Sequence, residues 1–394
     1  MARLLTLLLA ALMFVSAPGR AMAVEVRAAV LRIDYPRLLP ISRYDLKAPD
    51  LGFAGAMLAD EDNNTTGSFL GNTYDTTTVA VPPEEADAAL EEILADGRRL
   101  IVVMAEREDL LRLTRRAGEE GALVLNATAP DTVLRNGACR SNLLHIAPSD
   151  QMTTDAVAQF AIWKKWDRWF LISGSNPADL SLAESYRRSA NKFGARIVEE
   201  RTIEDTGGAR RTDTGHALVQ RQLPLDTQGA SRHDVVIAAD ATDYFARYLS
   251  YNLWDPRPVM GSGGLRPVTF HGAHEAWGAT QYHTRFEELT RRYVQPEDYN
   301  VWLALRVIGE AVTRVPIQPA RLTAAMLQRI DGLASLAEPV GRKAGLRVAM
   351  AAWHHFLPFA WACVIRLPSA HHSDFASHRR NPIRPFRCCL EAGC

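Results

Sequence analysis

The stretch TYDTTTVAVPPEEADAALEEILADGRRLIVVMAEREDLLRLTRRAGEEGALVLNAT, residues 73–128, alternates short apolar runs with longer amphipathic ones. TYDTTTVAV, RRLIVVMAE and ALVLNAT predict strands, because β-branched and apolar residues suit the pleated, buried positions of a sheet. EEADAALEEILADG and REDLLRLTRRAGEEG predict helices, and each run ends at a glycine. Such strand–helix alternation is typical of a parallel sheet that helices cover on both faces.

The same alternation continues on both sides of this stretch. Upstream, VRAAVLRI predicts a strand and residues 51–64 predict a helix. A connection rich in Pro and Asn follows at residues 129–150, after which the alternation restarts. The predicted strands are RWFLISG, RIVEERTI, DVVIAAD and PRPVMG, and the predicted helices are DQMTTDAVAQFAIWKKW, DLSLAESYRRSANKFGA and ATDYFARYLSYNLW. The sequence therefore predicts an α/β protein with two halves in series.

The segment WKKWDRWFLI, Trp163 to Ile172, raises the question of nucleic-acid binding, because bases stack on aromatic rings beside cations. However, the chain has 45 basic and 45 acidic residues, with no concentrated basic face to neutralise phosphates. Phe160, Trp163 and Trp166 share one helix face at spacings of three, and Trp169 starts an apolar strand. We interpret the aromatic residues as core packing and expect no nucleic-acid partner.

The first 23 residues have the pattern of a signal peptide. A short basic start precedes the apolar run LLTLLLAALMFVSA, and AMA at residues 21–23 matches the small-x-small pattern of signal peptidase sites. We expect cleavage near Ala23 and export, which in a bacterium means the periplasm. Cys139 is the only cysteine before residue 363, which excludes a scaffold built on disulfides.

Several motifs, in order along the chain, resemble those of type I periplasmic substrate-binding proteins of ABC transporters, such as the receptors for branched-chain amino acids. GAMLADEDNN followed by SFLGNTYD resembles the first helix of the family and its GGxLG turn. RSNLLHIAPSD resembles the first crossover between the lobes, and residues 286–312 resemble a segment with a long following helix. Residues 160–171 and 188–201 are similar to a subgroup associated with PQQ-dependent alcohol dehydrogenase systems.

This resemblance implies an α/β fold of two Rossmann-like lobes with parallel sheets, joined by a hinge of three crossovers. The expected divisions are a signal peptide at 1–23, the first part of lobe 1 at 24–147, lobe 2 at 148–282, the return to lobe 1 at 283–334, and a tail at 335–394. The third crossover is expected near residues 332–338. The ligand is expected between the lobes, at the carboxyl ends of the strands.

Polar residues that follow the predicted strands are the candidates for ligand contact. The candidates in lobe 1 are Asp34, Tyr35, Glu106, Asn126, Ala127 and Thr128. The candidates in lobe 2 are Ser173, Ser175, Asp240 and Thr242. For each of them the alternative is a helix cap, as Asp240 or Thr242 would form for the following helix. The segment SGSNPAD lacks the Tyr-Gly that amino-acid receptors of the family usually carry there, which argues against a branched-chain amino acid as ligand.

The sequence lacks the motifs of the enzyme classes that an α/β chain suggests. It has no G-x-S-x-G elbow, no G-x-G-x-x-G after its first strand, no Walker A loop and no HExxH pair. His271 and His274 with Glu275 offer a metal site, but a pair of histidines three residues apart is more often a surface loop. We expect no catalytic residue, no metal and no cofactor.

After about residue 340 the composition changes and the strand–helix alternation stops. The end of the chain holds four of the five cysteines and several histidines, but no CxxC or HxxxH spacing that would support a metal site. A disordered tail is a second alternative, although Trp, Phe and Ile are frequent. We interpret residues 335–394 as the product of a translation-frame shift near residue 340, in place of the terminal strands of lobe 2.

The resemblance implies a monomeric periplasmic protein that captures a small molecule linked to PQQ-dependent alcohol oxidation and delivers it to an ABC permease at the inner membrane. The alternative is a periplasmic sensor or accessory protein of the dehydrogenase system that uses the same cleft without transport. An α/β enzyme is the third interpretation, which the missing motifs disfavour.

Overall fold

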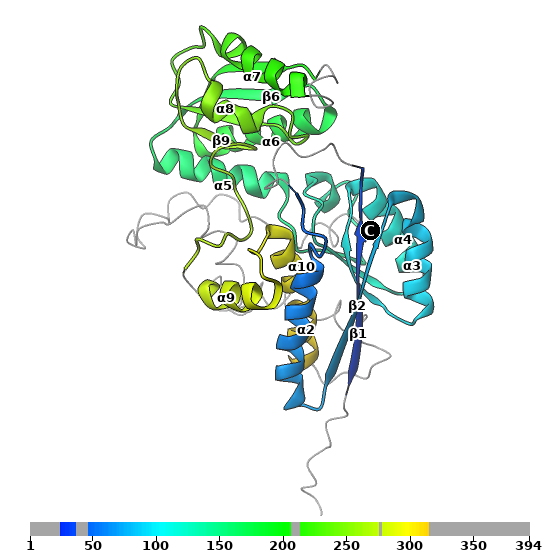
Figure 1. Cartoon of the computed structure of the whole chain (residues 1–394). Coiled ribbons are helices and arrows are strands. Elements are labelled where there is room, and N and C mark those ends of the chain that lie inside the picture. Colours follow the sequence, from blue (N-terminus) through cyan, green and yellow to red (C-terminus); the bar gives the residue numbers. More distant parts are fainter. Residues whose placement is uncertain (1–23, 37–45, 206–212, 276–277, 315–394) are drawn as a thin grey trace, which may run out of the picture.

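The computed structural model describes residues 24–36, 46–205, 213–275 and 278–314, whose strands form two separate parallel sheets (Figure 1). We call the part built on the first sheet lobe 1 and the part built on the second sheet lobe 2. The expected signal peptide, the third crossover near residues 332–338 and the tail at 335–394 lie outside the described residues. None of the described helices is long and apolar enough to cross a membrane.

The sheet of lobe 1 has the strand order β2-β1-β3-β4-β5. Its strands are β1 (Glu25–Ile33), β2 (Thr73–Val81), β3 (Leu100–Met104), β4 (Leu123–Asn126) and β5 (Leu143–His145). All neighbours pair in parallel, so the carboxyl ends of the strands lie at one edge of the sheet. β5 was not expected, because three residues within a loop-like sequence give no periodic signal.

Helices cover both faces of this sheet. Alternate residues of β1 point to opposite faces, so Val26 and Val30 pack against α2 (Phe53–Ser68) and α10 (Pro296–Arg314). Ala29 and Leu31 pack on the other face, against α3 (Ala86–Ala95) and α4 (Arg107–Glu119). Short 3₁₀ helices, η2 (Pro83–Glu85) and η3 (Thr132–Arg135), lie in the connections. The predicted strands and helices of residues 73–128 are thereby confirmed.

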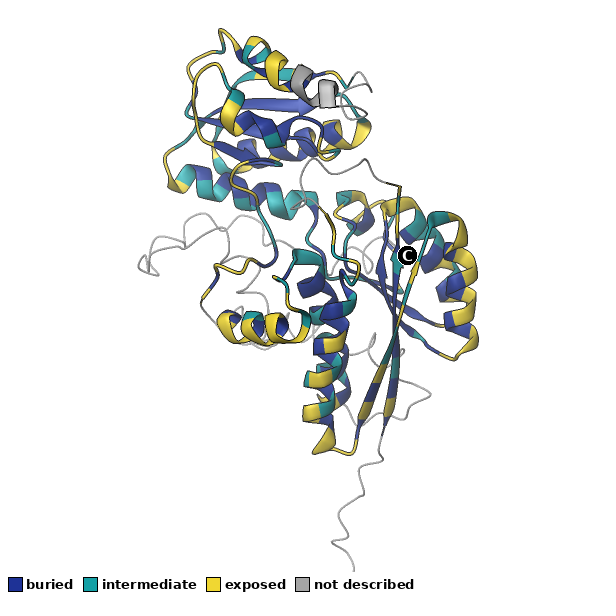
Figure 2. Ribbon diagram, in the orientation of Figure 1, coloured by how far each residue is buried: buried dark blue, intermediate teal, exposed yellow. Residues whose placement is uncertain are grey.

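Lobe 2 repeats this architecture with the strand order β7-β6-β8-β9. Its strands are β6 (Arg168–Gly174), β7 (Arg196–Ile203), β8 (Val235–Ala239) and β9 (Val259–Gly261). On one face, α5 (Asp150–Trp163) and α6 (Pro177–Phe193) pack against Trp169 and Leu171. On the other, α7 (Asp213–Thr227) and α8 (Ala246–Asn252) pack against Phe170 and Ile172. Buried residues fill the centre of both lobes (Figure 2).

The chain passes between the lobes twice within the described residues. It leaves lobe 1 between β5 and α5, at residues 146–149. It is back in lobe 1 by Phe270, which packs with α2 and with α9 (Ala279–Thr290) in an aromatic cluster that includes Tyr282 and Tyr299. This return is earlier than the boundary at residue 282 expected from the sequence.

The structure divides the aromatic residues of the Trp163–Ile172 segment between core and surface. Trp169 is fully buried between α5 and α6. Helix α5 ends at Trp163, so Trp166 lies beyond the helix rather than on its face, and its ring meets Phe160 edge-on. The side chain of Trp163 is 41% exposed and lies beneath the ammonium group of Lys164. Core packing is therefore correct for Trp169 and wrong for Trp163.

Candidate ligand-binding site

The lobe 1 candidates nearest the first strand join β1 to α4. The Tyr35 hydroxyl accepts a hydrogen bond from the Glu106 backbone N–H at 2.9 Å and donates one to Asp109 at 2.6 Å. Burial raises the pKa of Tyr35, and the hydrogen bond to Asp109 raises it further, so the phenol stays neutral. Asp34 pairs with Arg32 at 2.8 Å. Tyr35 and Glu106 thus lie together at the carboxyl edge of the sheet.

The candidates after β4 form a closed turn. The Asn126 side chain is fully buried, and its Oδ1 accepts from the backbone N–H groups of Thr128, at 3.1 Å, and of the following residue, at 2.9 Å. The carbonyl of Ala127 accepts a hydrogen bond from Asn300 of α10 at 2.9 Å. These bonds fix the shape of the loop, and Thr128 keeps a partly exposed side chain at its tip.

The two serine candidates of lobe 2 bond to neighbours within that lobe. The Ser173 hydroxyl is buried and lies 3.2 Å from the Thr202 hydroxyl on the adjacent strand. The Ser175 hydroxyl accepts a hydrogen bond from the Asp205 backbone N–H at 3.0 Å. Both bonds hold β7 and its following loop against β6.

Asp240 makes the capping contact that was the alternative to ligand contact, whereas Thr242 bonds to the neighbouring helix α6. The Asp240 carboxylate accepts from the backbone N–H groups of Tyr244, Phe245 and Ala246 at 2.7–2.8 Å, at the start of α8. The Thr242 hydroxyl donates to Asp179 of α6 at 3.1 Å. The loop after β8 is therefore rigidly held by side-chain-to-backbone bonds. Contact of any of these strand-end candidates with a ligand remains a proposal.

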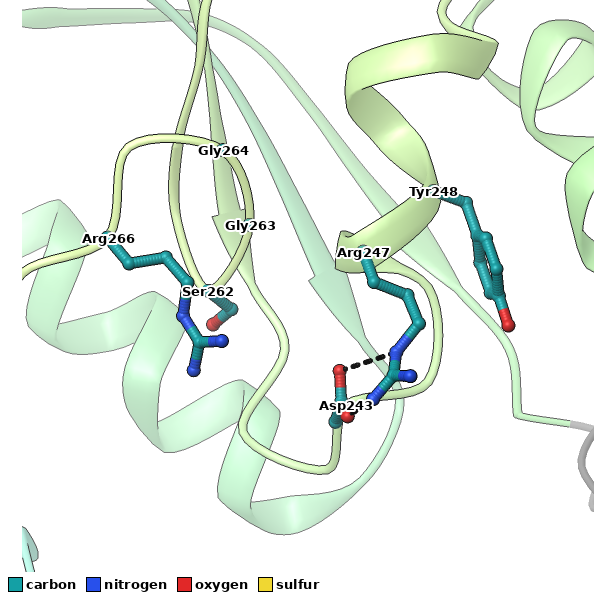
Figure 3. Close-up of a pocket in the computed structure, with 7 residues that line it drawn as sticks. All are labelled: Asp243, Arg247, Tyr248, Ser262, Gly263, Gly264 and Arg266. Atoms are coloured by element: carbon teal, nitrogen blue, oxygen red, sulfur yellow. Dashed lines mark hydrogen bonds and ion pairs between the residues drawn. The ribbon is translucent and has the colours of Figure 1, made fainter. Parts of the chain in front are cut away.

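A pocket of about 340 Å³ opens at the carboxyl ends of β8 and β9 in lobe 2 (Figure 3). This volume is within the range of sites for small ligands. The pocket is lined by Asp243, Arg247, Tyr248, Ser262, Gly263, Gly264 and Arg266. Its floor is the tight loop after β9, where a Cβ on Gly263 or Gly264 would clash with backbone atoms. Glycine lets that loop fold close against the sheet.

The charged groups of the pocket are not equally neutralised. Arg247 pairs with Asp243, four residues earlier. Arg266 forms no ion pair or hydrogen bond with any residue that the structure describes. The Ser262 hydroxyl accepts a hydrogen bond from the Asp240 backbone N–H at 3.0 Å, which leaves its own proton free to donate. Arg266 and Ser262 lie on the same side of the pocket in Figure 3, away from the Arg247–Asp243 pair.

Tyr186 of α6 lies beside this loop, and its side chain is buried. Its side chain is 2% exposed, and the hydroxyl would lie 2.7 Å from a Cβ on Gly261, the residue before Ser262. Burial raises the pKa of Tyr186, the charge of Asp150 raises it further, and Arg266 opposes the rise. The charges of Asp150 and Arg266 are therefore close enough to Tyr186 to shift its pKa in opposite directions.

Asp150 lies where the chain enters lobe 2, at the first residue of α5. Burial and the nearby charge of Asp131 raise the pKa of its carboxyl to about 7, against the opposing effect of Arg135. No ion pair joins Asp150 to a described residue. A partly buried carboxyl with a raised pKa is a common feature of functional sites.

These groups come from separate parts of the sequence and were not among the candidates. Ser262 directly follows the predicted strand PRPVMG, so the rule that selects polar residues after strands also applies to it. Tyr186 lies within a helix, and nothing in the sequence marks Arg266. Among the described residues, no group of three His, Cys, Asp or Glu side chains is arranged to hold a metal ion.

Residues 51–220 match the family described as periplasmic binding protein. A search of solved structures finds the fold in many chains. One is a leucine-, isoleucine-, valine-, threonine- and alanine-binding protein from Brucella ovis in a closed conformation, with a TM-score of 0.60 and 14% identity over 77% of this chain and 82% of the other. The chain has the fold of a type I periplasmic binding protein.

Two further structures share this periplasmic-binding-protein fold. An ABC transporter substrate-binding protein from Sphaerobacter thermophilus has a TM-score of 0.60 and 16% identity, covering 77% of this chain and 85% of its own. A solute-binding protein from R. palustris in complex with benzoate has a TM-score of 0.54 and 14% identity, with the same coverage. No curated protein sequence matches the chain. The family and the similar structures are binding proteins rather than enzymes, as the missing catalytic motifs predict.

Proposed function

We propose that this chain is the periplasmic solute-binding component of an ABC transporter, which captures a small molecule between its lobes and delivers it to an inner-membrane permease. The observation that carries the proposal is the pocket at the carboxyl ends of β8 and β9, which includes Arg266 at the start of the second connection between the lobes. In open parallel sheets, ligands bind at this edge. The family match over residues 51–220 supports the proposal.

Capture works by closing the two lobes over the ligand. The connections at residues 146–149 and 266–270 are the segments that would bend. A ligand stabilises the closed form only to the extent that it binds that form more tightly than the open one. We propose that Ser262 and Arg266 of lobe 2 hold the ligand, and that closure brings it to the carboxyl edge of lobe 1. There Tyr35, Glu106 and the Asn126–Thr128 loop would make the second set of contacts.

We further propose that the solute belongs to PQQ-dependent alcohol oxidation, as a substrate, a product or PQQ itself. The support is the similarity of residues 160–171 and 188–201 to the subgroup associated with those systems. The fold itself does not select the ligand, since one similar structure contains leucine and another contains benzoate.

The test is thermal unfolding of the purified chain with alcohols, aldehydes, short carboxylates, aromatic acids, amino acids and PQQ. A ligand at about 100 times its Kd adds about 2.7 kcal/mol to the free energy of unfolding, which raises Tm by several degrees. Small-angle X-ray scattering should then show a smaller radius of gyration with the same compound. If no compound raises Tm, solute capture is refuted. A Tm shift without a change in size would refute capture by lobe closure.

A further inference from the structure

The pocket of lobe 2 presents hydrogen-bond donors and an unpaired positive charge, and its one acidic side chain, Asp243, already forms an ion pair. Of its charged side chains, Asp243 is paired with Arg247, and Arg266 has no partner among the described residues. A guanidinium group beside a pocket whose one acid is already paired is suited to an oxyanion, which it binds through two parallel N–H bonds. The remaining positive charge therefore favours a negatively charged ligand.

The neighbouring hydroxyl groups add donors of the same kind. Ser262 already accepts the Asp240 backbone N–H, so its proton is available to a ligand oxygen. The Tyr186 side chain, which lies beside Gly261 at the end of β9, is 2% exposed and carries a second hydroxyl group. A hydroxyl group can donate its proton to a ligand oxygen.

We infer that the ligand of this protein carries an oxyanion, a carboxylate or a phosphate, and that Arg266 binds it together with the hydroxyl groups of Ser262 and Tyr186. This inference rests on the proposed function, because it names the class of solute that the pocket accepts. Neutral alcohols and aldehydes lack the charge that Arg266 needs, so they would bind much more weakly than the corresponding acids. Among products of alcohol oxidation, the inference selects the acids.

The charge of the ligand is tested by isothermal titration calorimetry with matched compounds. Benzoate is compared with benzyl alcohol, succinate with succinamide, and inorganic phosphate serves as the third anion. We expect at least one anion to bind, and a carboxylate that binds should do so at least about tenfold more tightly than its neutral counterpart. Binding of phosphate alone identifies a phosphate site, and binding of benzoate or succinate identifies a carboxylate site.

Variants then assign the site. Arg266→Gln should weaken binding of that anion about 10- to 100-fold, since hydrogen bonds to charged groups are the strong ones. Arg257→Gln is the matched control, because Arg257 is an exposed arginine before the opposite end of β9 and pairs with Asp255. It should leave the affinity unchanged. Ser262→Ala and Tyr186→Phe, which keep the packing, should each weaken binding several-fold.

The outcomes separate the two proposals. If neutral compounds bind as tightly as the anions, or if Arg266→Gln and Arg257→Gln have equal effects, the oxyanion site is refuted while solute capture stands. If nothing in this panel or the broader thermal panel binds, both proposals are refuted. If the anion binds and only Arg266→Gln, Ser262→Ala and Tyr186→Phe weaken it, the site is confirmed.

Discussion

Replacing Asp150 with Asn should stabilise this protein at alkaline pH and change its stability little in acid. Burial and the charge of Asp131 raise the pKa of Asp150 from 3.8 to about 7. This rise of about 3 units disfavours the ionised carboxylate in the folded state by about 4 kcal/mol. The amino end of α5 favours a negative charge by up to about 1 kcal/mol. We therefore expect the Asn variant to gain about 3 kcal/mol above pH 7.

The direction of the pH effect follows from proton binding. Between the two pKa values, the folded protein holds a proton on Asp150 that the unfolded chain has released. The stability that this proton gives is complete below pH 3.8 and is lost as the pH rises through about 7. The asparagine side chain does not ionise, so the stability of the variant does not fall over this pH range through position 150.

The assay is urea unfolding of the wild type and of Asp150→Asn at pH 5 and pH 8. Glu108→Gln is the control, because the Glu108 side chain is 87% exposed, and its effect should be small at both pH values. Asp131→Asn removes the like charge and should reduce part of the wild-type pH dependence. Equal effects of Asp150→Asn at pH 5 and pH 8 would show that Asp150 ionises normally and would refute the reasoning.

Three further changes test the packing that positions the site, each by urea unfolding. Gly55→Ala should lower the free energy of unfolding by at least about 2 kcal/mol, because the new Cβ would lie well under 3.0 Å from the Asp298 carbonyl where α2 meets α10. An unchanged urea midpoint would show that the two helices separate easily. Asp240→Ala should lower the free energy of unfolding by about 3 kcal/mol or more, since three backbone N–H groups lose their acceptor. A loss under about 1 kcal/mol would mean that water bonds to these N–H groups in place of the carboxylate. Trp169→Ala should lower the free energy of unfolding by about 3–5 kcal/mol and Trp163→Ala by under about 1 kcal/mol, because Trp169 is buried and Trp163 is 41% exposed. Equal losses would contradict the assignment of Trp169 to the core and Trp163 to the surface.

Where the sequence pattern is long and regular, local physics was sufficient to predict the structure. The strands β2, β6 and β7 match the predicted runs residue for residue, since β-branched and apolar residues there alternate or cluster as a buried strand requires. Helix α10 was expected from the resemblance. The short strand β5 and helix α7 were not expected, because β5 has only three residues and α7 carries Pro224 inside it.

The residues of the proposed oxyanion site could not be predicted, although the strand ends could. Helix α6 was predicted, but a tyrosine within a helix is usually core, and only the fold brings the Tyr186 hydroxyl beside Gly261 of β9, next to Ser262. Asp240 was correctly weighed as either a cap or a ligand contact, and its three hydrogen bonds to α8 are known only from the fold.

The order of apolar and polar residues by itself determined that this chain forms two parallel α/β halves, because strand and helix periods are local properties of the chain. Tertiary structure decided which charges stay unpaired. Asp150, Tyr186 and Arg266 are far apart in the sequence, and their interaction depends on how α5, α6 and the loop after β9 pack. Burial and distance set the strength of such interactions, and both exist only once the lobes have folded.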